Sequence, residues 1–454
     1  MLFKKIRSQG LAHNSYIIGD SGESVVIDPR RDIDIYLKNT TRQGYEITTV
    51  LETHRNEDFI IGSLELQKKT EALIFHADDH LDYQYGQPVK DEQIFEIGRL
   101  RLKALHTPGH TPGSFSYVLY GYEGKPLMVF SGDALFAGDV GRVDFLGEEK
   151  LEKTAGALYE SIYDKILPLG DEVILCPAHG AGSVCASAIA ERNWTTIGLE
   201  KKLNPHLQYE SKKEFIQQVG QMLEYPPYFE KMEQYNLEGP PLLAENKEVK
   251  ALSPGKFAVL SRQKDTVIID TRMEVSFASA HIPGSISIWS EGLSSFAGWF
   301  IKSEKNILLV SEGDFPEKEI KYLNRLGFDK IEGYLAGGMV GWHMAAEKSV
   351  SINTVTVDKL CCLLDEKKVN FLLDIRSQDE INNDGEIPDS VNIHLTQLLK
   401  NLDQLPAEKD IYIFCGSGLR SMTAASLLKK EGYNNLNVVL GGLEGWSSTT
   451  CPIK

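Results

Sequence analysis

The sequence predicts a multidomain chain of α/β and α+β class, in which a larger first domain precedes two copies of a small parallel α/β domain. Its 454 residues are enough for about three domains. The first half contains apolar, strand-like runs that each end in a Gly- or Pro-rich turn carrying His or Asp. The second half repeats itself at a spacing of 104 residues, and each copy alternates short apolar strands with helical stretches.

Composition bounds the class of protein. Apolar residues make up 42% of the chain and charged residues 25%, as in an ordinary soluble protein. No apolar run approaches the ~20 residues of a membrane span, and the N-terminal MLFKKIRSQG lacks the apolar core of an export signal, so we expect a cytoplasmic protein with no membrane partner. A net charge of −16 argues against nucleic acid as a partner. We expect the six cysteines to be reduced thiols.

The chain begins with a predicted pair of strands. Residues 11–19 and 24–28 are apolar runs joined by a Gly-rich turn, and the pattern of the next segment predicts a helix that ends at Gly44. Arg30 and Arg31 stand where this helix begins. We expect Arg31 to lie in solvent at the helix start.

The most informative stretch is ETHRNEDFIIGS, residues 52–63. It follows an apolar, strand-like run and precedes a segment with helical periodicity. His54, Asn56 and Asp58 therefore stand on a strand-to-helix turn, where their side chains are able to converge on one point. Imidazole and carboxylate groups at alternate positions of such a turn suit a metal site. The alternative is a polar turn with one stray histidine.

Three later stretches favour the metal site, because each places a His or Asp directly after a strand-like run. They are TPGH ending at His110, FSGD ending at Asp133 and CPAH ending at His179. Four strand ends of this kind, in this order, resemble the metallo-β-lactamase fold over roughly residues 1–240. The resemblance implies an αββα sandwich that gathers its metal ligands from loops at one edge.

The usual HxHxDH motif of that fold is altered here, because Asn56 replaces its second histidine and Phe59 its last. Phe59 cannot bind a metal, so the second of the two metal sites of the fold is broken. His54, His110 and Asp133 remain, and two imidazoles with one carboxylate suit Fe(II) and oxygen chemistry. The chain thus resembles the persulfide dioxygenase branch of the fold. That branch implies one Fe(II) per chain, which Zn can replace in recombinant protein.

Other residues near the expected site carry further predictions. Asn56 and Asp58 should support the ligands by hydrogen bonds without binding the metal. Arg142 resembles an arginine near the iron pocket of persulfide dioxygenases, where it would hold an anionic thiol substrate by bidentate bonds. The alternative is an arginine that ties its loop to a carboxylate. His179 is expected to hydrogen-bond substrate or the surroundings of the iron, and Cys185 to be a buried, inert thiol.

The rest of the chain is organised by the internal repeat. A helical linker containing prolines closes a predicted first domain of residues 1–245, and the two copies are predicted domains at residues 250–350 and 354–454. VIIDTR, which contains Asp270, matches FLLDIR, which contains Asp374. LAGGMVGW matches LGGLEGW at the same spacing. These motifs resemble the rhodanese domain.

The second copy carries a loop suited to sulfur chemistry. A strand-like run is followed there by CGSGLRS and then by a helix. Backbone N–H groups of Gly416, Ser417 and Gly418 at this helix start would stabilise a thiolate or persulfide anion on Cys415. Arg420 would close the loop on that anion.

The first copy lacks these groups. Ser311 stands at the position of Cys415, and Pro316 stands at that of Arg420, so we expect this copy to be inactive and to serve in spacing or docking. Rhodanese-like folds also serve as phosphatases, which need a Cys-x5-Arg cradle around the phosphate. The loop here is Cys-x4-Arg, which suits a single sulfur atom and favours sulfur transfer.

Together the resemblances imply a persulfide dioxygenase–rhodanese fusion with a role in sulfide detoxification. Such a protein oxidises a low-molecular-weight thiol persulfide with oxygen to give sulfite. A Cys415 persulfide would then pass its sulfane sulfur to sulfite, which gives thiosulfate. Related proteins imply a homodimer or homotetramer. Two alternatives stay open, namely a zinc-dependent thioester hydrolase of the glyoxalase II type and a non-catalytic sulfur-binding protein.

Overall fold

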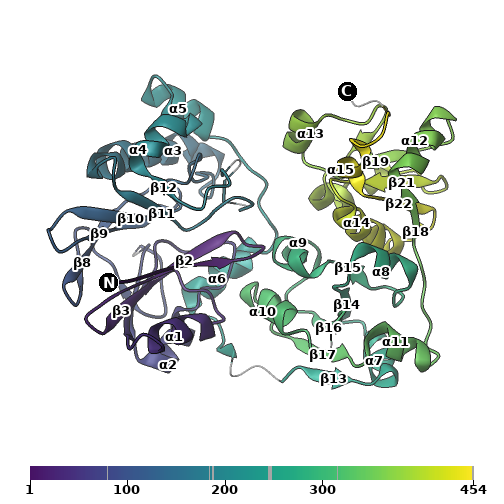
Figure 1. Ribbon diagram of the computed structural model, residues 1–454, viewed down its shortest axis with the longest axis horizontal. Coiled ribbons are helices and arrows are strands. Elements are labelled where there is room, and N and C mark those ends of the chain that lie inside the picture. Colours follow the sequence, from purple (N-terminus) through teal and green to yellow (C-terminus); the bar gives the residue numbers. More distant parts are fainter. Residues whose placement is uncertain (79, 184, 187–188, 244–247, 314, 452–454) are drawn as a thin grey trace. The chain divides into compact units, whose positions relative to one another are not determined.

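The structure is a computed structural model that describes residues 1–454 except 79, 184, 187–188, 244–247, 314 and 452–454. The chain separates into two compact units (Figure 1). The first comprises Met1–Asn246 with Asn324–Gly327, and the second comprises Lys247–Leu323 with Phe328–Lys454. The predicted domain limit at residue 245 lies outside the described residues, and both copies of the repeat fall in the second unit apart from Asn324–Gly327.

Two six-stranded sheets form the first unit within its described residues, in the orders β1-β2-β3-β4-β5-β6 and β12-β11-β10-β9-β8-β7. The strands of the first are β1 (Leu2–Ser8), β2 (His13–Asp20), β3 (Glu23–Ile27), β4 (Glu46–Leu51), β5 (Leu73–His76) and β6 (Gln87–Pro88). Those of the second are β7 (Ile94–Ile97), β8 (Leu100–His106), β9 (Phe115–Tyr120), β10 (Pro126–Gly132), β11 (Ile174–Pro177) and β12 (Thr195–Thr196). The helices are α1 (Asp34–Thr41), α2 (Ser63–Thr70), α3 (Leu151–Glu160), α4 (Ile197–Leu203), α5 (Lys212–Val219) and α6 (Phe229–Glu238).

The two sheets enclose one apolar core between their facing sides, to which Tyr16 of β2, Tyr117 of β9 and Phe130 of β10 contribute. Helices α1 and α2 cover the outer face of the first sheet, with Leu66 of α2 in its outer core. Helices α3 and α5 cover the outer face of the second sheet, where Phe215 of α5 is buried. Figure 1 shows these layers. The arrangement confirms the predicted αββα sandwich.

The second unit contains two five-stranded sheets of the same order, β13-β17-β16-β14-β15 and β18-β22-β21-β19-β20. The first consists of β13 (Lys250–Leu252), β14 (Thr266–Asp270), β15 (Ile286–Ser287), β16 (Asn306–Val310) and β17 (Ile331–Leu335), with α7 (Pro254–Ser261), α8 (Glu274–Ser279), α9 (Leu293–Phe300), α10 (Glu317–Arg325) and α11 (Gly338–Met344). The second consists of β18 (Asn353–Thr356), β19 (Leu372–Asp374), β20 (Val391–Asn392), β21 (Ile411–Phe414) and β22 (Leu436–Leu440), with α12 (Val357–Asp365), α13 (Gln378–Asp384), α14 (Leu419–Lys430) and α15 (Gly442–Trp446). Their described ladders are parallel, which confirms the predicted repeat of small parallel α/β domains.

Each copy holds a buried Asp–Arg pair at the end of one strand, β14 in the first copy and β19 in the second. Arg272 donates from Nε and Nη2 to the two carboxylate oxygens of Asp270, at 2.8 and 2.7 Å. Arg376 binds Asp374 in the same way, with 2.7 Å from its Nη2 to Oδ2. Both guanidinium groups also donate to a backbone carbonyl at 2.8 Å. The DxR motif therefore folds as an internal brace in both copies.

Three details of the first unit and of the cysteines differ from the sequence-based expectation. Strand β1 was not expected, because three charges within LFKKIRS dilute its alternating apolar pattern. The prediction for Arg31 is wrong, because its side chain is buried and donates to the Pro241 carbonyl. The prediction of six reduced thiols is also wrong, since Cys361 and Cys451 form a disulfide.

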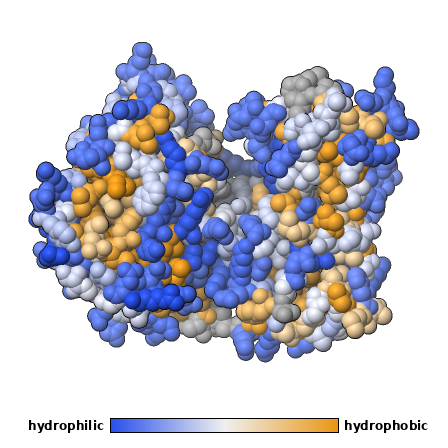
Figure 2. All heavy atoms as spheres, viewed as in Figure 1, coloured by the Kyte–Doolittle hydropathy of each residue, from blue (hydrophilic) through white to orange (hydrophobic). Residues whose placement is uncertain are grey.

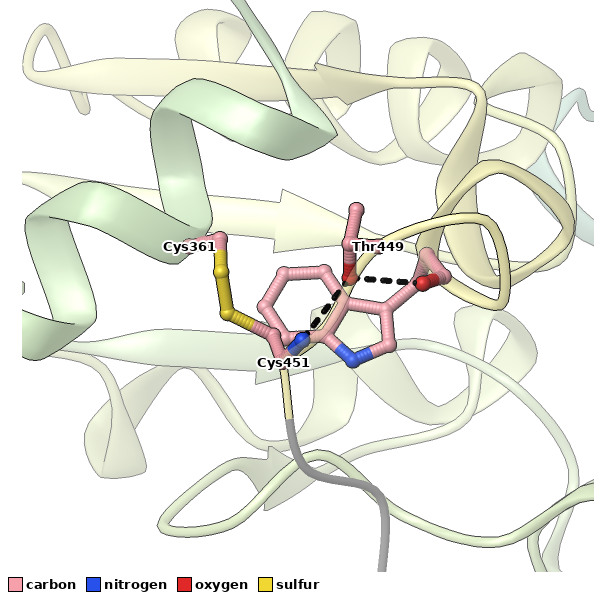
Figure 3. Close-up of a disulfide and its surroundings, with 4 residues drawn as sticks. Cys361, Thr449 and Cys451 are labelled. Carbon is pink, nitrogen blue, oxygen red and sulfur yellow. Dashed lines mark hydrogen bonds between the residues drawn. A yellow bond between two sulfur atoms is a disulfide. The ribbon is translucent and has the colours of Figure 1, made fainter.

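The disulfide fastens the C-terminal segment to α12 (Figure 3). Cys451 follows a turn in which Thr449 Oγ1 donates to the Trp446 carbonyl at 2.7 Å and accepts from Cys451 N at 3.2 Å. Cys362, next to the bonded Cys361, is an exposed free thiol.

Polar and apolar side chains are interspersed over the face drawn in Figure 2, with hydrophilic residues prominent. Among the residues that the structure describes, none of the helices combines the length and the apolar content that crossing a membrane requires.

Candidate functional site

Loops that follow the strands β4, β8, β10 and β11 carry the predicted site residues of the first unit. Thr53 fixes the first of these loops, because its backbone N–H and its hydroxyl both donate to Asp28, at 2.8 and 2.7 Å. Gly132 ends β10 with a φ of 53°, and a Cβ there would lie 2.9 Å from Thr53. The left-handed backbone and the close packing both favour glycine directly before Asp133.

His54, His110 and Asp133 lie together and are buried. Oδ2 of Asp133 is 3.8 Å from Nε2 of His54 and 3.5 Å from Nε2 of His110. Neither Nε2 atom has a hydrogen-bond partner among the described residues. The Nδ1 atom of each ring is hydrogen-bonded, to the Thr53 hydroxyl at 2.8 Å and to the Arg142 carbonyl at 2.9 Å. A carbonyl at Nδ1 of His110 selects the tautomer whose Nε2 presents a lone pair to the cluster.

The charges of the cluster follow from burial and from neighbouring groups. Burial lowers the pKa of His54 to about 3, so its ring is neutral and able to bind a metal. Burial alone would raise the pKa of the Asp133 carboxyl, but the nearby His179 and His54 rings lower it below its ordinary value. The site therefore presents a neutral imidazole beside an ionised carboxylate.

His179 bridges two carboxylates rather than standing free. Its Nδ1 is 2.8 Å from Asp133 Oδ1, and its Nε2 is 3.0 Å from Asp58 Oδ2. Burial opposes ionisation of this ring, but Asp133 and Asp58 raise its pKa well above the ordinary value. Phe59 is fully buried, and its ring is tilted against that of His13 at a centroid distance of 4.1 Å. Asn56 donates to the His54 carbonyl at 3.2 Å, so it touches the backbone of a predicted ligand.

The side chain of Arg142 is hydrogen-bonded to Asp144 of its own loop. Its Nε and Nη2 donate to the two carboxylate oxygens of Asp144, each at 2.7 Å. It also donates to the backbone carbonyl of Glu224 at 3.2 Å. This geometry is what we expect of an arginine that ties the loop to a carboxylate, and a contact of Arg142 with substrate stays a prediction.

Glu57 was not predicted to face the cluster, whereas Cys185 was predicted to be a buried thiol near the site. Glu57 is fully buried, with its Oε2 3.7 Å from Nε2 of His110. Cys185 is also fully buried, and its Sγ lies within 4.8 Å of ligand atoms of Asp58 and His179. Burial and the nearby Asp58 raise the pKa of Cys185 well above the ordinary value, which keeps it a thiol. The alternation of His54, Asn56 and Asp58 in the sequence drew attention away from position 57, yet the turn brings it inward.

The loop after β21 holds Cys415 at the start of α14. Cys415 is buried, and its Sγ accepts a hydrogen bond from Gly418 N at 3.1 Å. Gly418 has a φ of 113°, which only glycine adopts readily. The Cys415 carbonyl accepts from Leu443 N at 2.8 Å, and a Cβ on Gly442 would lie 2.3 Å from that carbonyl oxygen. The glycine turn after β22 therefore supports the cysteine loop.

Arg420 lies beside this loop but is paired with Glu380. Its Nη1 and Nη2 donate to the two Glu380 oxygens, at 2.7 and 2.5 Å. A Cβ on Gly416 would lie 3.4 Å from Arg420 Nη2, so the guanidinium reaches the rim of the loop. Contact of Arg420, Gly416 and Ser417 with a bound anion stays a prediction.

The equivalent loop of the first copy is built differently. Ser311 Oγ donates to the Gly313 carbonyl at 3.2 Å, and α10 begins only at Glu317, after Pro316. Residue 314 of this loop lies outside the described residues. A Cβ on Gly338 would lie 3.6 Å from the Ser311 carbonyl oxygen, so the glycine turn is less tightly packed on the loop.

Comparison with known proteins agrees with this architecture. Residues 9–179 match the family model of the metallo-beta-lactamase superfamily, and residues 253–345 and 356–449 match that of the rhodanese-like domain. The human protein "Persulfide dioxygenase ETHE1, mitochondrial" is 30% identical over 215 residues, which are 46% of this chain and 76% of the human protein. The chain belongs to the metallo-β-lactamase superfamily.

Two further relatives of this superfamily member inform its function. A crystal structure of a metallo-beta-lactamase from Staphylococcus aureus subsp. aureus COL is 30% identical, with a TM-score of 0.65, and the match covers 74% of this chain and 98% of that one. "Hydroxyacylglutathione hydrolase GloC" of Haemophilus influenzae is 26% identical over 219 residues, which are 43% of this chain and 93% of that protein. The relatives thus include both a dioxygenase and a hydrolase, and the chain is a superfamily domain followed by two rhodanese-like domains.

Proposed function

We propose that the chain is a non-haem iron persulfide dioxygenase joined to a sulfurtransferase. The observation that carries this proposal is the pair of buried Nε2 atoms of His54 and His110, which lack hydrogen-bond partners among the described residues and face the Asp133 carboxylate. A buried polar atom without a partner is destabilising unless something else binds it. Two imidazoles and one carboxylate fit Fe(II), and similarity to a persulfide dioxygenase supports the same reading.

Fe(II) bound there would supply a place where oxygen and a persulfide sulfur meet for oxidation. The chain's own residues would orient and protect this chemistry. The Thr53 hydroxyl and the Arg142 carbonyl hold the two rings through their Nδ1 atoms. Burial of the cluster excludes bulk water, and His179 would hold the second carboxylate oxygen of Asp133 in place. Overall, one persulfide, one oxygen molecule and one water would give one thiol, one sulfite and two protons.

The second activity would reside in the Cys415 loop. The Cys415 thiolate would attack the outer sulfur of a thiol persulfide, so that the thiol leaves and Cys415 carries a persulfide. Sulfite would then attack the outer sulfur of that persulfide, which releases thiosulfate and regenerates the thiolate. The N–H of Gly418 already points at Sγ, and the start of α14 adds its positive dipole end.

Metal analysis combined with oxygen uptake tests the proposal. Protein loaded with Fe(II) should hold about one iron per chain and consume oxygen with a small-thiol persulfide. His110→Ala should lose iron and oxygen uptake together, whereas Asn56→Ala should keep its iron. His106→Ala is the matched control, because this partly exposed histidine also lies at the end of β8 but binds the Pro112 carbonyl. Iron retention by His110→Ala would overturn the proposal.

A zinc-dependent thioester hydrolase is the second candidate. Asp58, His179 and Cys185 place ligand atoms within 4.8 Å of one another, and GloC is similar over most of its length. Phe59 and the two carboxylate bonds of His179 favour the single-metal alternative. Two tightly bound zinc ions per chain, with hydrolysis of a glutathione thioester, would establish the hydrolase instead.

A further inference from the structure

Glu57 is a buried acid whose charge is not balanced by a close partner among the described residues. Neither of its carboxylate oxygens has a hydrogen-bond partner there. The guanidinium of Arg55 is 3.7 Å from Oε1, but the same nitrogen lies closer to Glu233, at 3.0 Å. A buried carboxylate without close partners is strongly destabilising unless a cation compensates for its charge.

The carboxylate of Glu57 points at the atoms that face Asp133. Its Oε2 is 3.7 Å from Nε2 of His110, and Asp133 Oδ2 is 3.5 Å from the same nitrogen. Ligand atoms of His54, Glu57 and His110 all lie within 4.8 Å of one another. Atoms that each sit about 2.0–2.2 Å from one ion are separated by roughly 3–4 Å, so this spacing suits ligands of a shared cation.

A direct hydrogen bond between Glu57 and His110 explains the arrangement less well. Nδ1 of His110 lies 2.9 Å from the Arg142 carbonyl, which can only accept, so the ring proton of the neutral form is on Nδ1. Nε2 of that form carries a lone pair, as do the Glu57 oxygens. The 3.7 Å between Nε2 and Oε2 is longer than a hydrogen bond and fits two ligands of one metal ion.

We propose that Glu57 is a fourth protein ligand of the metal ion, in addition to the two histidines and Asp133. The inference rests on the proposed metal site and adds a residue to it. Asn56 occupies the position of a motif histidine, and its neighbour Glu57 supplies an additional donor from the same turn. A second carboxylate neutralises the remaining charge of a divalent ion in this buried site and leaves fewer open positions for oxygen and substrate.

The experiment compares Glu57→Gln with Glu52→Gln. Glu52 is a buried acid of the same loop that accepts hydrogen bonds from Ser63 and Tyr85. Glutamine at this position keeps an acceptor oxygen for these hydroxyls, so the variant removes an acid from the same loop without removing their partner. The affinity of each protein for Fe(II) is measured by competition with a chelator, and the ferrous–nitrosyl complex is examined by electron paramagnetic resonance.

Glu57→Gln should bind Fe(II) at least about 10-fold more weakly and change the nitrosyl spectrum, since loss of a metal contact weakens binding by that much or more. Glu52→Gln should match the parent in both measurements, and Glu57→Asp should recover part of the affinity. Parent-like affinity and spectrum in Glu57→Gln would overturn the inference alone. Failure of the parent to bind Fe(II) through His110 would instead overturn the proposed function.

A crystal structure of the iron-loaded parent protein keeps the inference testable if the variants do not fold. A Glu57 oxygen at about 2.0–2.2 Å from the ion would support it. A separation beyond about 3 Å, with the histidines bound, would refute it.

Discussion

The two rhodanese-like copies end a central strand at equivalent positions, β16 before Ser311 and β21 before Cys415. Both share the same sheet order and the same buried Asp–Arg brace. They differ in the residue after the strand, in the start of the next helix and in the Glu380–Arg420 pair, which the first copy lacks. The comparison teaches that the scaffold and the reactive loop are separate properties of this fold. The first copy keeps the brace and the sheet although its loop has Ser311 in place of the cysteine.

The largest expected difference between the copies is in sulfur transfer. Cys415→Ser should lower transfer from thiosulfate to cyanide by at least about a thousandfold, because a hydroxyl does not supply the attacking anion. Oxygen uptake should remain, and the product of persulfide oxidation should shift from thiosulfate to sulfite. Ser311→Ala should change neither activity. Transfer at the parent rate by Cys415→Ser would contradict this prediction.

The second-largest effect, a loss of unfolding free energy, should be equal in the two copies. Asp270→Ala and Asp374→Ala each leave a buried arginine without its carboxylate, which costs about 3–5 kcal/mol of unfolding free energy. Denaturant unfolding, followed by the fluorescence of Trp342 or Trp446, measures the two effects. A loss in one copy only would show that the braces are not equivalent.

A smaller loss of stability, caused by opening the disulfide, should be confined to the second copy, because only that copy has the disulfide. Cys451→Ser opens a connection between residues 90 positions apart and should lower the stability of this copy by about 2 kcal/mol. Cys362→Ser is the control, since that exposed thiol is unbonded. Equal thermal unfolding of the two variants under oxidising conditions would contradict the prediction.

The smallest effect should be a difference in acid sensitivity. Burial opposes ionisation of Glu380, yet Arg420 lowers its pKa from 4.5 to about 2. Because the folded value lies below the ordinary one, the pair stabilises the second copy above about pH 4.5, and this contribution is lost as the pH falls toward 2. The partly exposed pair contributes about 1 kcal/mol at most. Glu380→Gln should remove the extra loss, measured as unfolding free energy between pH 5 and 3.

Much of this molecule could be predicted from periodicity and turn residues. Strand ends followed by His or Asp located the buried cluster of His54, His110 and Asp133, and the repeat predicted two sheets of one order. Pairings between distant residues could not be predicted, because they depend on tertiary contact. Arg31 at a polar helix start is buried against Pro241, and Cys361 meets Cys451 across 90 residues. Glu57 was missed because the alternation of His54, Asn56 and Asp58 suggested that only every second residue points into the site. That spacing holds in a strand, whereas the turn here also brings position 57 inward.

The glycine turn after the last strand of each copy has a consequence for recognising enzymes by sequence. In the second copy, Gly442 is indispensable, because any side chain there would collide with the Cys415 carbonyl. The first copy retains the same paired glycines although Gly338 has more room around it and supports a serine loop. A search that scores the GGxxGW signature therefore detects ancestry of the fold in both copies. It counts two rhodanese-like domains, of which only the second has a cysteine in this loop.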